Sequence, residues 1–297
     1  MSFSRVCLIG LGEVGQILAE DLAKAGVNDI AAYDVLFAKT DSAPSRAARR
    51  LSVRAAASGA DAAKGAEVIF CAVTAANDVE AARSVLPGIS AGCFFIDLNS
   101  ASPGVKQESA ALIDGAGGRY VEAAVMTPFP PKRIASPTLL GGPHAEDFLS
   151  RAAPLGVSMK IASPRVGVAS ATKMCRSVII KGMEALLTES MISARRYGVE
   201  KEVLASLSDL LPVGDWEKLA RYMISRALEH GVRRAEEMRE VARTVSEAGL
   251  APLMSAACAE RQDWSALHKG ALAEADLYAM LDHLLKDIDA ENKKGAA

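Results

Sequence analysis

Lys173 stands in a largely apolar stretch that begins at Gly167, and its amine is a group that can carry a proton. Burial disfavours the charged form of an amine, so a desolvated lysine has a pKa lowered towards neutrality and exchanges protons readily. Ser177 follows four residues later, so on a helix the two side chains share one face. The alternative is a lysine on the solvent side of a long helix, and spacing by itself leaves both open.

A second group of residues that could do chemistry lies near the start of the chain. A short apolar run ends in Gly10, Gly12 and Gly15, and a helical pattern follows at once. Such a turn lets the backbone approach a pyrophosphate and directs the N-terminus of a helix at it. Asp34 closes a second apolar run at about the 20-residue spacing that is typical of dinucleotide sites. These features predict a dinucleotide-binding turn, and the alternative is a tight turn that holds no ligand.

Polar side chains also follow two later apolar runs. In an open α/β sheet, ligands bind beyond the carboxyl ends of the strands. We expect Val73 and Thr74 to line the inner ribose, and Asn99 and Ser100 to anchor a carboxylate, helped by free N–H groups at a helix end. The alternative for Ser100 is simple capping of the next helix. The predicted cofactor-binding residues are Gly10, Leu11, Gly12, Glu13, Val14, Gly15, Asp34, Val73, Thr74 and Asn99.

The charges around Asp34 bear on the choice of cofactor. Its carboxylate can accept hydrogen bonds from an adenosine ribose and would repel a 2′-phosphate, which favours NAD over NADP. Four basic residues lie just downstream and could bind such a phosphate, so NADP is the alternative. These basic residues are Lys39, Arg46, Arg49 and Arg50.

The elements that must position these residues alternate in the first half of the chain. Short apolar patterns and helical patterns follow one another, which predicts a mostly parallel, doubly wound sheet. From residue 166 to 196 the spacing is helical without a proline, a run of about 45 Å at about 1.5 Å per residue. We therefore expect an α/β fold with a Rossmann-like dinucleotide-binding domain (1–163), one long connecting helix and an all-helical substrate and dimerisation domain (164–297).

Glycine and proline mark the expected breaks in the helical half. Breaks are predicted at 212–214, Gly231, Gly249 and Gly270, and the last residues, 293–297, are predicted to be a frayed tail.

Composition bounds the class of function. The chain has 297 residues and a formal net charge of -2, so charge gives no case for binding nucleic acid or an anionic membrane. Apolar runs stay well short of the about 18 residues of a membrane helix, and the first strand pattern begins too early to leave room for a signal peptide. The five cysteines are scattered and never spaced as CxxC, which indicates buried free thiols, no metal site and a reducing, cytoplasmic setting.

Four stretches of the sequence resemble, in order, the β-hydroxyacid dehydrogenase superfamily, which includes 3-hydroxyisobutyrate dehydrogenase and 6-phosphogluconate dehydrogenase. The glycine turn is similar to the family's cofactor turn. Residues 97–103 are similar to its substrate-binding stretch, with the same distance from Asp to Pro. Residues 122–127 and then 139–142 resemble its next block in weakened form, and residues 167–177 resemble the start of its catalytic helix.

This resemblance implies an NAD(P)-dependent oxidoreductase that moves a hydride between the nicotinamide and the hydroxyl-bearing carbon of a small hydroxy acid. Lys173 falls on the family's catalytic lysine, which implies a general base in oxidation and a general acid in reduction. Asn99, Ser100 and Thr127 would hold the carboxylate and hydroxyl of the hydroxy acid or keto acid. Ser177 would orient the substrate or the lysine.

Departures from the family pattern indicate a pocket reshaped for another substrate. Ser177 stands where the family usually has Asn, and residues 126–128 replace its Ser-Gly-Gly. A Lys-Asp pair that contacts the active site in many members is replaced near Glu236 and Glu237. Just before it, Arg233 or Arg234 could bind a substrate carboxylate bidentately. The alternative is that Arg233 pairs with a neighbouring glutamate on a solvated helix.

Two other functions stay open on these residues. An imine reductase of the same architecture is disfavoured by Lys173, because those related enzymes generally lack the lysine. A non-catalytic NAD-binding interaction protein, whose helical half serves only for dimerisation, is disfavoured by the same lysine. An extended helical half needs a partner to bury its apolar faces, so we also expect a homodimer.

Overall fold

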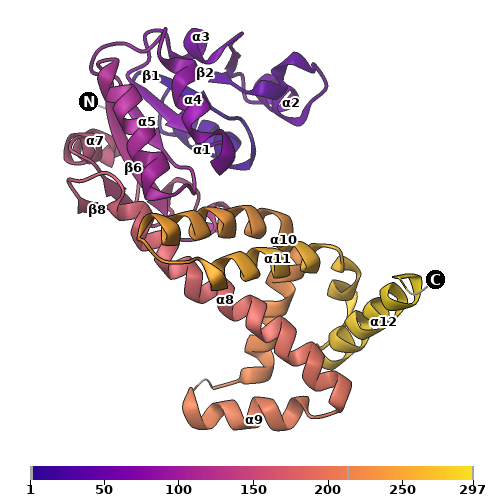
Figure 1. Cartoon of the computed structure of the whole chain (residues 1–297). Helices are drawn as coiled ribbons and strands as arrows, with labels where there is room; N and C mark the ends of the chain where they lie inside the picture. The colour runs from indigo at the N-terminus through magenta and orange to yellow at the C-terminus, as the bar shows by residue number, and fades with distance from the viewer. Residues whose placement is uncertain (1–2, 213, 296–297) are drawn as a thin grey trace. The chain divides into compact units, whose positions relative to one another are not determined.

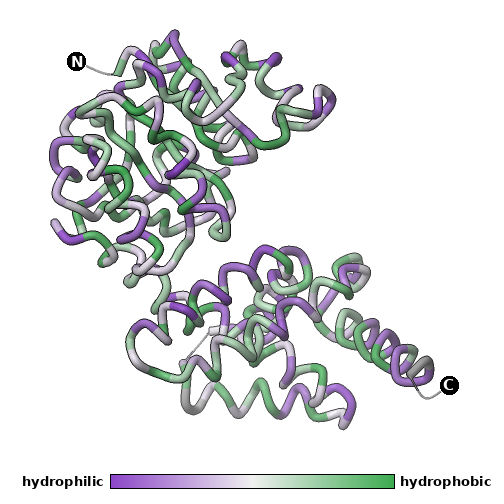
Figure 2. The backbone as a smooth tube through the Cα atoms, turned by 45° about the horizontal axis from the view of Figure 1, so that its top comes forward, coloured by the Kyte–Doolittle hydropathy of each residue, from purple (hydrophilic) through white to green (hydrophobic). Residues whose placement is uncertain are grey.

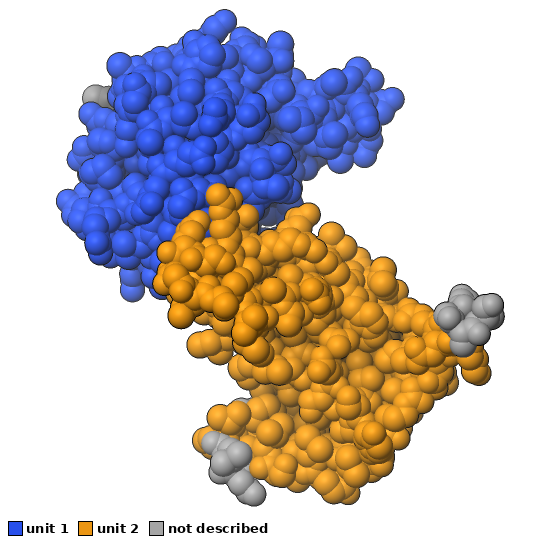
Figure 3. Space-filling model, viewed as in Figure 1, with its two compact units in different colours: residues 1–174 blue, residues 175–297 orange. Residues whose placement is uncertain are grey.

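The computed structural model describes residues 3–212 and 214–295 of the chain. They divide into two compact units, Met1–Met174 and Cys175–Ala297 (Figure 1, Figure 3). The boundary falls inside one long helix. The predicted start without a leader (residues 1 and 2), part of the predicted break (Val213) and the last two residues of the predicted tail lie outside the described residues.

The first unit is built on one eight-stranded sheet. Its strands are β1 (Arg5–Ile9), β2 (Asp29–Tyr33), β3 (Arg54–Ala55), β4 (Val68–Cys71), β5 (Phe94–Asp97), β6 (Arg119–Val125), β7 (Thr138–Gly141) and β8 (Met159–Ser163). Their order across the sheet is β3-β2-β1-β4-β5-β6-β7-β8. Neighbouring strands are parallel except for β6 and β7, which are antiparallel. The predicted mostly parallel, doubly wound sheet is confirmed.

Helices connect these strands, and serine side chains begin several of them. The α-helices are α1 (Glu13–Lys24), α2 (Ala43–Arg50), α3 (Gly59–Ala63), α4 (Asp78–Val85), α5 (Pro103–Gly115), α6 (Phe129–Lys132) and α7 (Ala145–Ala152). The 3-10 turns are η1 (Val35–Ala38), η2 (Ala75–Asn77), η3 (Arg133–Ala135) and η4 (Ala153–Leu155). Ser42, Ser58 and Ser102 each accept a backbone N–H as the N-cap of α2, α3 and α5. Such caps satisfy donors that the helix itself leaves without partners.

Apolar layers cover the sheet on both faces. Along β1, Val6 and Leu8 belong to one core cluster, while Cys7 and Ile9 belong to the other. Successive side chains of a strand point to opposite faces, so alternate residues enter different layers. A strand that is buried on both sides reads as a continuous apolar run, which is the pattern that predicted these strands.

The second unit is helical throughout the part that the structure describes. Its elements are α8 (Val168–Tyr197), which starts in the first unit, α9 (Glu200–Leu210), α10 (Trp216–Glu247), α11 (Leu253–Ala266), η5 (Lys269–Ala273) and α12 (Leu277–Gly295). Hydrophilic and hydrophobic residues interchange along these helices (Figure 2), as they do in helices that bury one side. The buried sides form a core around Met191, Ile224, Leu228 and Leu281.

Among the described residues, no helix combines the length and the apolar character needed to cross a membrane.

Gly231 does not break a helix, contrary to the prediction. Helix α10 runs without interruption from Trp216 to Glu247. A Cβ on Gly231 would lie 2.3 Å from the carbonyl oxygen of Gln262 and 2.9 Å from the Cβ of Ala266, both in α11. The glycine is therefore needed for the close approach of two helices rather than for a turn.

Two smaller predictions are also corrected. Helix α12 extends to Gly295, so the predicted tail at 293–297 is helical over its described part. Four of the five cysteines are buried, but Cys175 is exposed. It lies next to the exposed Arg176 on the solvent side of α8, so burial of the thiol is wrong at this position.

Candidate functional site

The glycine turn leaves room for a ligand at Gly12. Gly10 has a φ of +90°, and a Cβ there would lie 2.4 Å from the carbonyl oxygen of Ala72. A Cβ on Gly15 would lie 2.2 Å from the carbonyl oxygen of Gly10, whereas a Cβ on Gly12 would meet nothing within 4 Å. Gly12 is the N-cap residue of α1, and no side chain in the described part of the chain accepts a hydrogen bond from the first N–H groups of this helix. The first N–H groups of the helix and the open backbone at Gly12 together fit the demands of a pyrophosphate.

Asp34 ties this turn to the end of β2. One of its carboxylate oxygens accepts the N–H of Leu11 and the other accepts the N–H of Leu36, each at 2.9 Å. The side chain is partly exposed. A carboxylate has about four lone-pair sites, so it can accept further hydrogen bonds from a ribose. Within the turn itself, Leu11 and Gly15 are buried, Val14 is partly buried, and Gly12 and Glu13 are exposed.

Asn99 joins the carboxyl ends of β4 and β5. Its Oδ1 accepts the N–H of Val73 at 2.7 Å, and its Nδ2 donates to the Sγ of Cys71 at 3.4 Å. Thr74 follows on the exposed side, where its Oγ1 accepts from the Nδ2 of Asn77 at 2.7 Å. The structure thus brings Asn99, Val73 and Thr74 together at one edge of the sheet. Because the Asn99 side chain is buried and engaged, its contacts shape this edge.

Ser100 and Lys173 meet although they are far apart in the sequence. The Nζ of Lys173 donates a hydrogen bond to the Oγ of Ser100 at 2.6 Å. Helix α5 is capped by Ser102, whose Oγ accepts the N–H of Val105 at 3.4 Å. The helix-cap alternative for Ser100 is therefore wrong, and its hydroxyl instead faces the lysine.

Buried Glu122 in β6 holds the start of α8. Its Oε2 accepts the N–H of Gly167 at 2.8 Å and its Oε1 accepts the N–H of Ser170 at 2.6 Å. A carboxylate at this position satisfies helix-end donors and interacts favourably with the helix dipole. Gly167 has a φ of +99°, and a Cβ on Gly141 in β7 would lie 2.4 Å from the Oε2 of Glu122. The sheet therefore fixes the first turn of α8, and Lys173 lies in the next turn.

Thr127 lies exposed in the loop after β6. Arg133 fixes this loop to α1, since its guanidinium lies 2.8 Å from both the Oδ1 of Asp21 and the Oε2 of Glu20. The N–H of Ile134 also donates to Asp21 at 3.2 Å. The loop that carries Thr127 is thus anchored to the helix that follows the glycine turn.

Ser177 and Arg233 belong to the second unit. Ser177 follows Lys173 by about one turn along α8. Arg233 is exposed and donates to the Oε1 of Glu237, four residues further along α10, at 2.7 Å. The same carboxylate also accepts from the Nζ of Lys181. The alternative that Arg233 pairs with a neighbouring glutamate is confirmed.

The sequence patterns did not predict a buried cluster of charged side chains that contacts Asn99 through Asp97. Lys106 of α5 is only 1% exposed, and its Nζ lies 2.6 Å from the Oδ1 of Asp97 and 3.4 Å from the Oδ2 of Asp78. The hydroxyl of Tyr120 donates to the other oxygen of Asp97 at 2.7 Å. Burial raises the pKa of Asp97 to about 6, although the nearby ammonium of Lys106 opposes the rise.

Two signals in the sequence could have found the buried ionic residues. Lys106 precedes Ala110 and Ile113 at helical spacing, on the face of α5 that is buried. Glu122 interrupts an otherwise apolar strand pattern. A charge at a position of apolar periodicity needs a buried partner, because an isolated charge is costly to remove from water.

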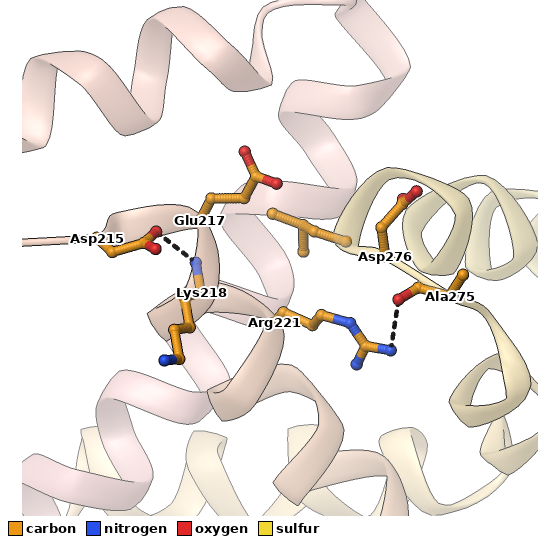
Figure 4. Close-up of a pocket in the computed structure, with 7 residues that line it drawn as sticks. Asp215, Glu217, Lys218, Arg221, Ala275 and Asp276 are labelled. Atoms are coloured by element: carbon orange, nitrogen blue, oxygen red, sulfur yellow. Dashed lines mark hydrogen bonds between the residues drawn. The ribbon is translucent and has the colours of Figure 1, made fainter.

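A pocket of about 360 Å³ in the second unit contains none of the predicted site residues (Figure 4). Arg221 of α10 points across it and donates to the carbonyl oxygens of Glu274 and Ala275. Asp215 accepts the N–H of Lys218 as the N-cap of α10. The Arg221 bonds join the start of α10 to the chain before α12, whereas the Asp215 bond caps α10. None of the residues that line the pocket belongs to the candidate site.

Comparisons with known proteins agree with this arrangement. Residues 5–148 match a model of the NAD binding domain of 6-phosphogluconate dehydrogenase. Residues 194–265 match a domain of unknown function, DUF1932. The first match covers the glycine turn, Asp34 and the Asn99–Ser100 edge, and the second covers much of the helical unit. The chain therefore carries a nicotinamide-cofactor domain of the dehydrogenase type.

Three individual proteins are similar over most of this chain. A conserved hypothetical protein from Sinorhizobium meliloti 1021 is 35% identical, with 94% of this chain and 96% of that chain covered and a TM-score of 0.75. Human mitochondrial 3-hydroxyisobutyrate dehydrogenase is 25% identical over 70% of this chain and 66% of its own length. The 3-hydroxyisobutyrate dehydrogenase of Mycobacterium tuberculosis, solved with L-serine, is 19% identical over 96% of this chain and 99% of that chain, with a TM-score of 0.72. The last of these shares the fold, a Rossmann-like unit followed by a helical one.

Proposed function

Since the chain belongs to the β-hydroxyacid dehydrogenase superfamily as a divergent member, we propose that this NAD(P)-dependent oxidoreductase acts on the hydroxyl-bearing carbon of a small hydroxy acid. The observation that carries the proposal is the 2.6 Å hydrogen bond between Lys173 and Ser100. It joins a lysine of the long helix to a hydroxyl at the carboxyl edge of the sheet. That edge is where open α/β sheets bind their ligands.

In the proposed reaction, Lys173 exchanges the proton of the substrate. When bound, the nicotinamide supplies hydride transfer to or from the substrate carbon. In oxidation the Nζ of Lys173, as the neutral amine, takes the proton of the substrate hydroxyl, and in reduction the ammonium returns it. Ser100 orients Nζ by accepting its hydrogen bond, and Glu122 holds the first turn of the helix beneath it.

The substrate contacts follow the same geometry. Ser100 and the exposed Thr127 are proposed to hold the carboxylate and the hydroxyl or keto oxygen directly. The Asn99 amide is engaged with Val73, so we propose that Asn99 contributes by setting the turn. Ser177 stays a prediction from the family resemblance, and Arg233, which pairs with Glu237, stays a prediction from the chemistry of its guanidinium.

For the cofactor we propose NAD rather than NADP. Asp34 places a negative charge at the end of β2, where a 2′-phosphate would be repelled. Of the downstream basic residues, Arg46 and Arg49 donate to the backbone oxygens of Asp41 and Thr40. Titration of the chain with NADH and NADPH, followed by quenching of intrinsic fluorescence, tests this choice. NADH is expected to bind more tightly, and tighter binding of NADPH would contradict it.

We further propose a homodimer. Several large apolar side chains of the second unit are exposed in the single chain, and burying such side chains is the main driving force of association. They include Ile179, Leu186, Tyr222, Val232, Leu253 and Met254.

A substrate panel separates the proposal from its alternatives. The full chain is incubated with small 2- and 3-hydroxy acids and NAD, and separately with cyclic imines and the reduced cofactor, and the change in reduced cofactor is followed by absorbance. Turnover of hydroxy acids supports the proposal. Reduction of imines alone would favour the imine reductase. Cofactor binding without hydride transfer to or from any compound would favour a binding protein.

A further inference from the structure

Lys106 connects two helices and a strand through a buried set of charges. Its ammonium group lies between Asp97, at the end of β5, and Asp78, at the start of α4. Ser109, one turn further along α5, donates to the second oxygen of Asp78 at 2.7 Å. All three charged side chains are almost fully buried. Water therefore screens the attraction between these charges only weakly. The ion pairs fix the end of β5 relative to both helices.

Asp97 connects this buried set of charges to the candidate active site. The Oδ1 that binds Lys106 also accepts the backbone N–H of Asn99 at 3.0 Å, and Oδ2 accepts the hydroxyl of Tyr120. Asn99 in turn accepts the N–H of Val73. The next residue, Ser100, accepts the hydrogen bond of Lys173. A continuous series of contacts therefore runs from Lys106 to the turn that faces the lysine.

Packing alone does not require a charge at this position. Replacing a buried ion pair with apolar residues of similar volume is often neutral or stabilising, so the pair is weak evidence for a role in stability. What an ionic group adds is direction, because its hydrogen bonds have preferred angles and lengths. Burial lowers the pKa of Lys106, but Asp97 and Asp78 outweigh this effect and raise it, so the ammonium form persists.

We propose that Lys106 is a positioning residue: held between Asp97 and Asp78, it fixes the Asn99–Ser100 turn against Val73 and so sets the Ser100 hydroxyl opposite Lys173. The catalytic part of this inference rests on the proposed function. The structural part, the hold on the turn, is independent of it.

The test compares three variants of the full chain. Lys106→Met combined with Asp78→Asn removes the ammonium without leaving two unpaired buried carboxylates. Arg83→Met combined with Glu108→Gln is the matched control, because it removes an exposed 3.2 Å ion pair between the same two helices. Tyr120→Phe removes one donor to Asp97 with little change in volume, and it serves if the first variant does not fold.

Hydrogen exchange of single amides, measured by NMR, reports the hold on the turn. We expect hydrogen exchange at the amides of Asn99 and Val73 to become about tenfold faster or more in the Lys106 variant. Their acceptors, the side chains of Asp97 and Asn99, remain but are no longer held in place. Tyr120→Phe should change the same amides in the same direction by less. Amides of β1 should keep their rates in every variant, and the control should match the wild type throughout. Unchanged exchange at Asn99 and Val73 would overturn the inference.

Kinetics with the substrate found by the panel test the catalytic part. The Lys106 variant is expected to show a kcat about tenfold lower or more, with a smaller change in the KM for the cofactor, because Val73 and Asn99 are also predicted cofactor residues. Faster exchange together with a wild-type kcat would show a purely structural role and overturn the positioning role. If the wild type turns over no hydroxy acid or keto acid, the proposed function fails and the catalytic part fails with it. The exchange rates then still decide whether Lys106 holds the turn.

Discussion

The hydroxyl of Ser100 accepts a hydrogen bond of 2.6 Å from the amine of Lys173. A lysine side chain has four rotatable bonds, so a fixed partner for Nζ restricts where its proton is delivered. Ser102, two residues later, has a different task, because it caps α5. Ser100 therefore orients the lysine, whereas Ser102 stabilises the helix.

Ser100→Ala is expected to lower turnover by about tenfold to a hundredfold, because the misplaced amine no longer meets the substrate in the reactive geometry. Its thermal midpoint should stay close to that of the wild type. Ser102→Ala is the control: loss of an N-cap costs about 1 kcal/mol of stability and should spare turnover. Equal losses of turnover in the two variants, measured as kcat beside thermal unfolding, would contradict the separation.

Single residues were predictable where type and local spacing were sufficient. The glycines of the turn and Asp34 were chosen from local spacing, whereas Lys173 was chosen because residues 167–177 resemble the start of a family's catalytic helix, and the roles of all of them stay predictions. The helical spacing of Lys106 with Ala110 and Ile113 could have indicated its burial, but its partners lie on β5 and α4 and form no local pattern with it. A buried ion pair is a property of the fold, because its two partners come from separate elements and a local sequence pattern contains only one of them.

At the scale of elements, one glycine decides how two helices pack. The strand and helix patterns of the first unit predicted its sheet, because apolar runs and helix caps are local signals. The prediction failed at Gly231, which lies in the interior of α10. Glycine is the poorest helix former apart from proline, so a break was the local expectation. The close contact with α11 overrides that propensity, and such a contact leaves no local pattern.

Gly231→Ala is expected to reduce the free energy of unfolding by about 1–3 kcal/mol, because the added methyl group would overlap the backbone of α11. Gly182→Ala is the matched control in α8. A Cβ there meets nothing within 4 Å, so the better helix propensity of alanine should raise stability by up to about 1 kcal/mol. Both values come from urea unfolding. Stabilisation by Gly231→Ala would contradict the packing role.

At the scale of the whole molecule, the boundary between the two compact units falls within α8. The helical pattern is continuous across the boundary between Met174 and Cys175, so no break in the sequence marks it. The association of two chains is likewise a property of surfaces that form only after folding. Exposed apolar side chains of the helical unit support the proposed dimer, but local patterns do not reveal which side chains will be exposed.

Light scattering coupled to size-exclusion chromatography measures the association state. We expect a mass of two chains at micromolar concentration. Val232→Lys together with Leu186→Lys should shift the mass towards one chain, since charges on exposed apolar positions oppose burial. A single-chain mass for the wild type would contradict the dimer.

The stability of the protein should depend on pH through the titration of Asp97. The neighbouring side chains are those of Lys106, Asp78 and Tyr120. Burial raises the pKa of Asp97 from 3.8 to about 6, so the folded state binds the proton more tightly than the unfolded state. The stability from this group is complete below the unfolded pKa and is lost as pH rises through about 6. The thermal midpoint of the wild type relative to Asp97→Asn should therefore rise as pH falls from about 7 to about 4. A difference that shrinks over this range would contradict the raised pKa.

Lys173, as the group that exchanges the substrate proton, is the residue on which the proposed function depends most. The direct test compares Lys173→Met with the wild type in two measurements, NADH affinity by fluorescence titration and turnover of the hydroxy acid found by the panel. Methionine keeps the length of the side chain and removes the amine. We predict unchanged NADH affinity and a kcat lower by about 10²–10⁴, the usual contribution of a general acid or base. Near-normal turnover by Lys173→Met would contradict the account.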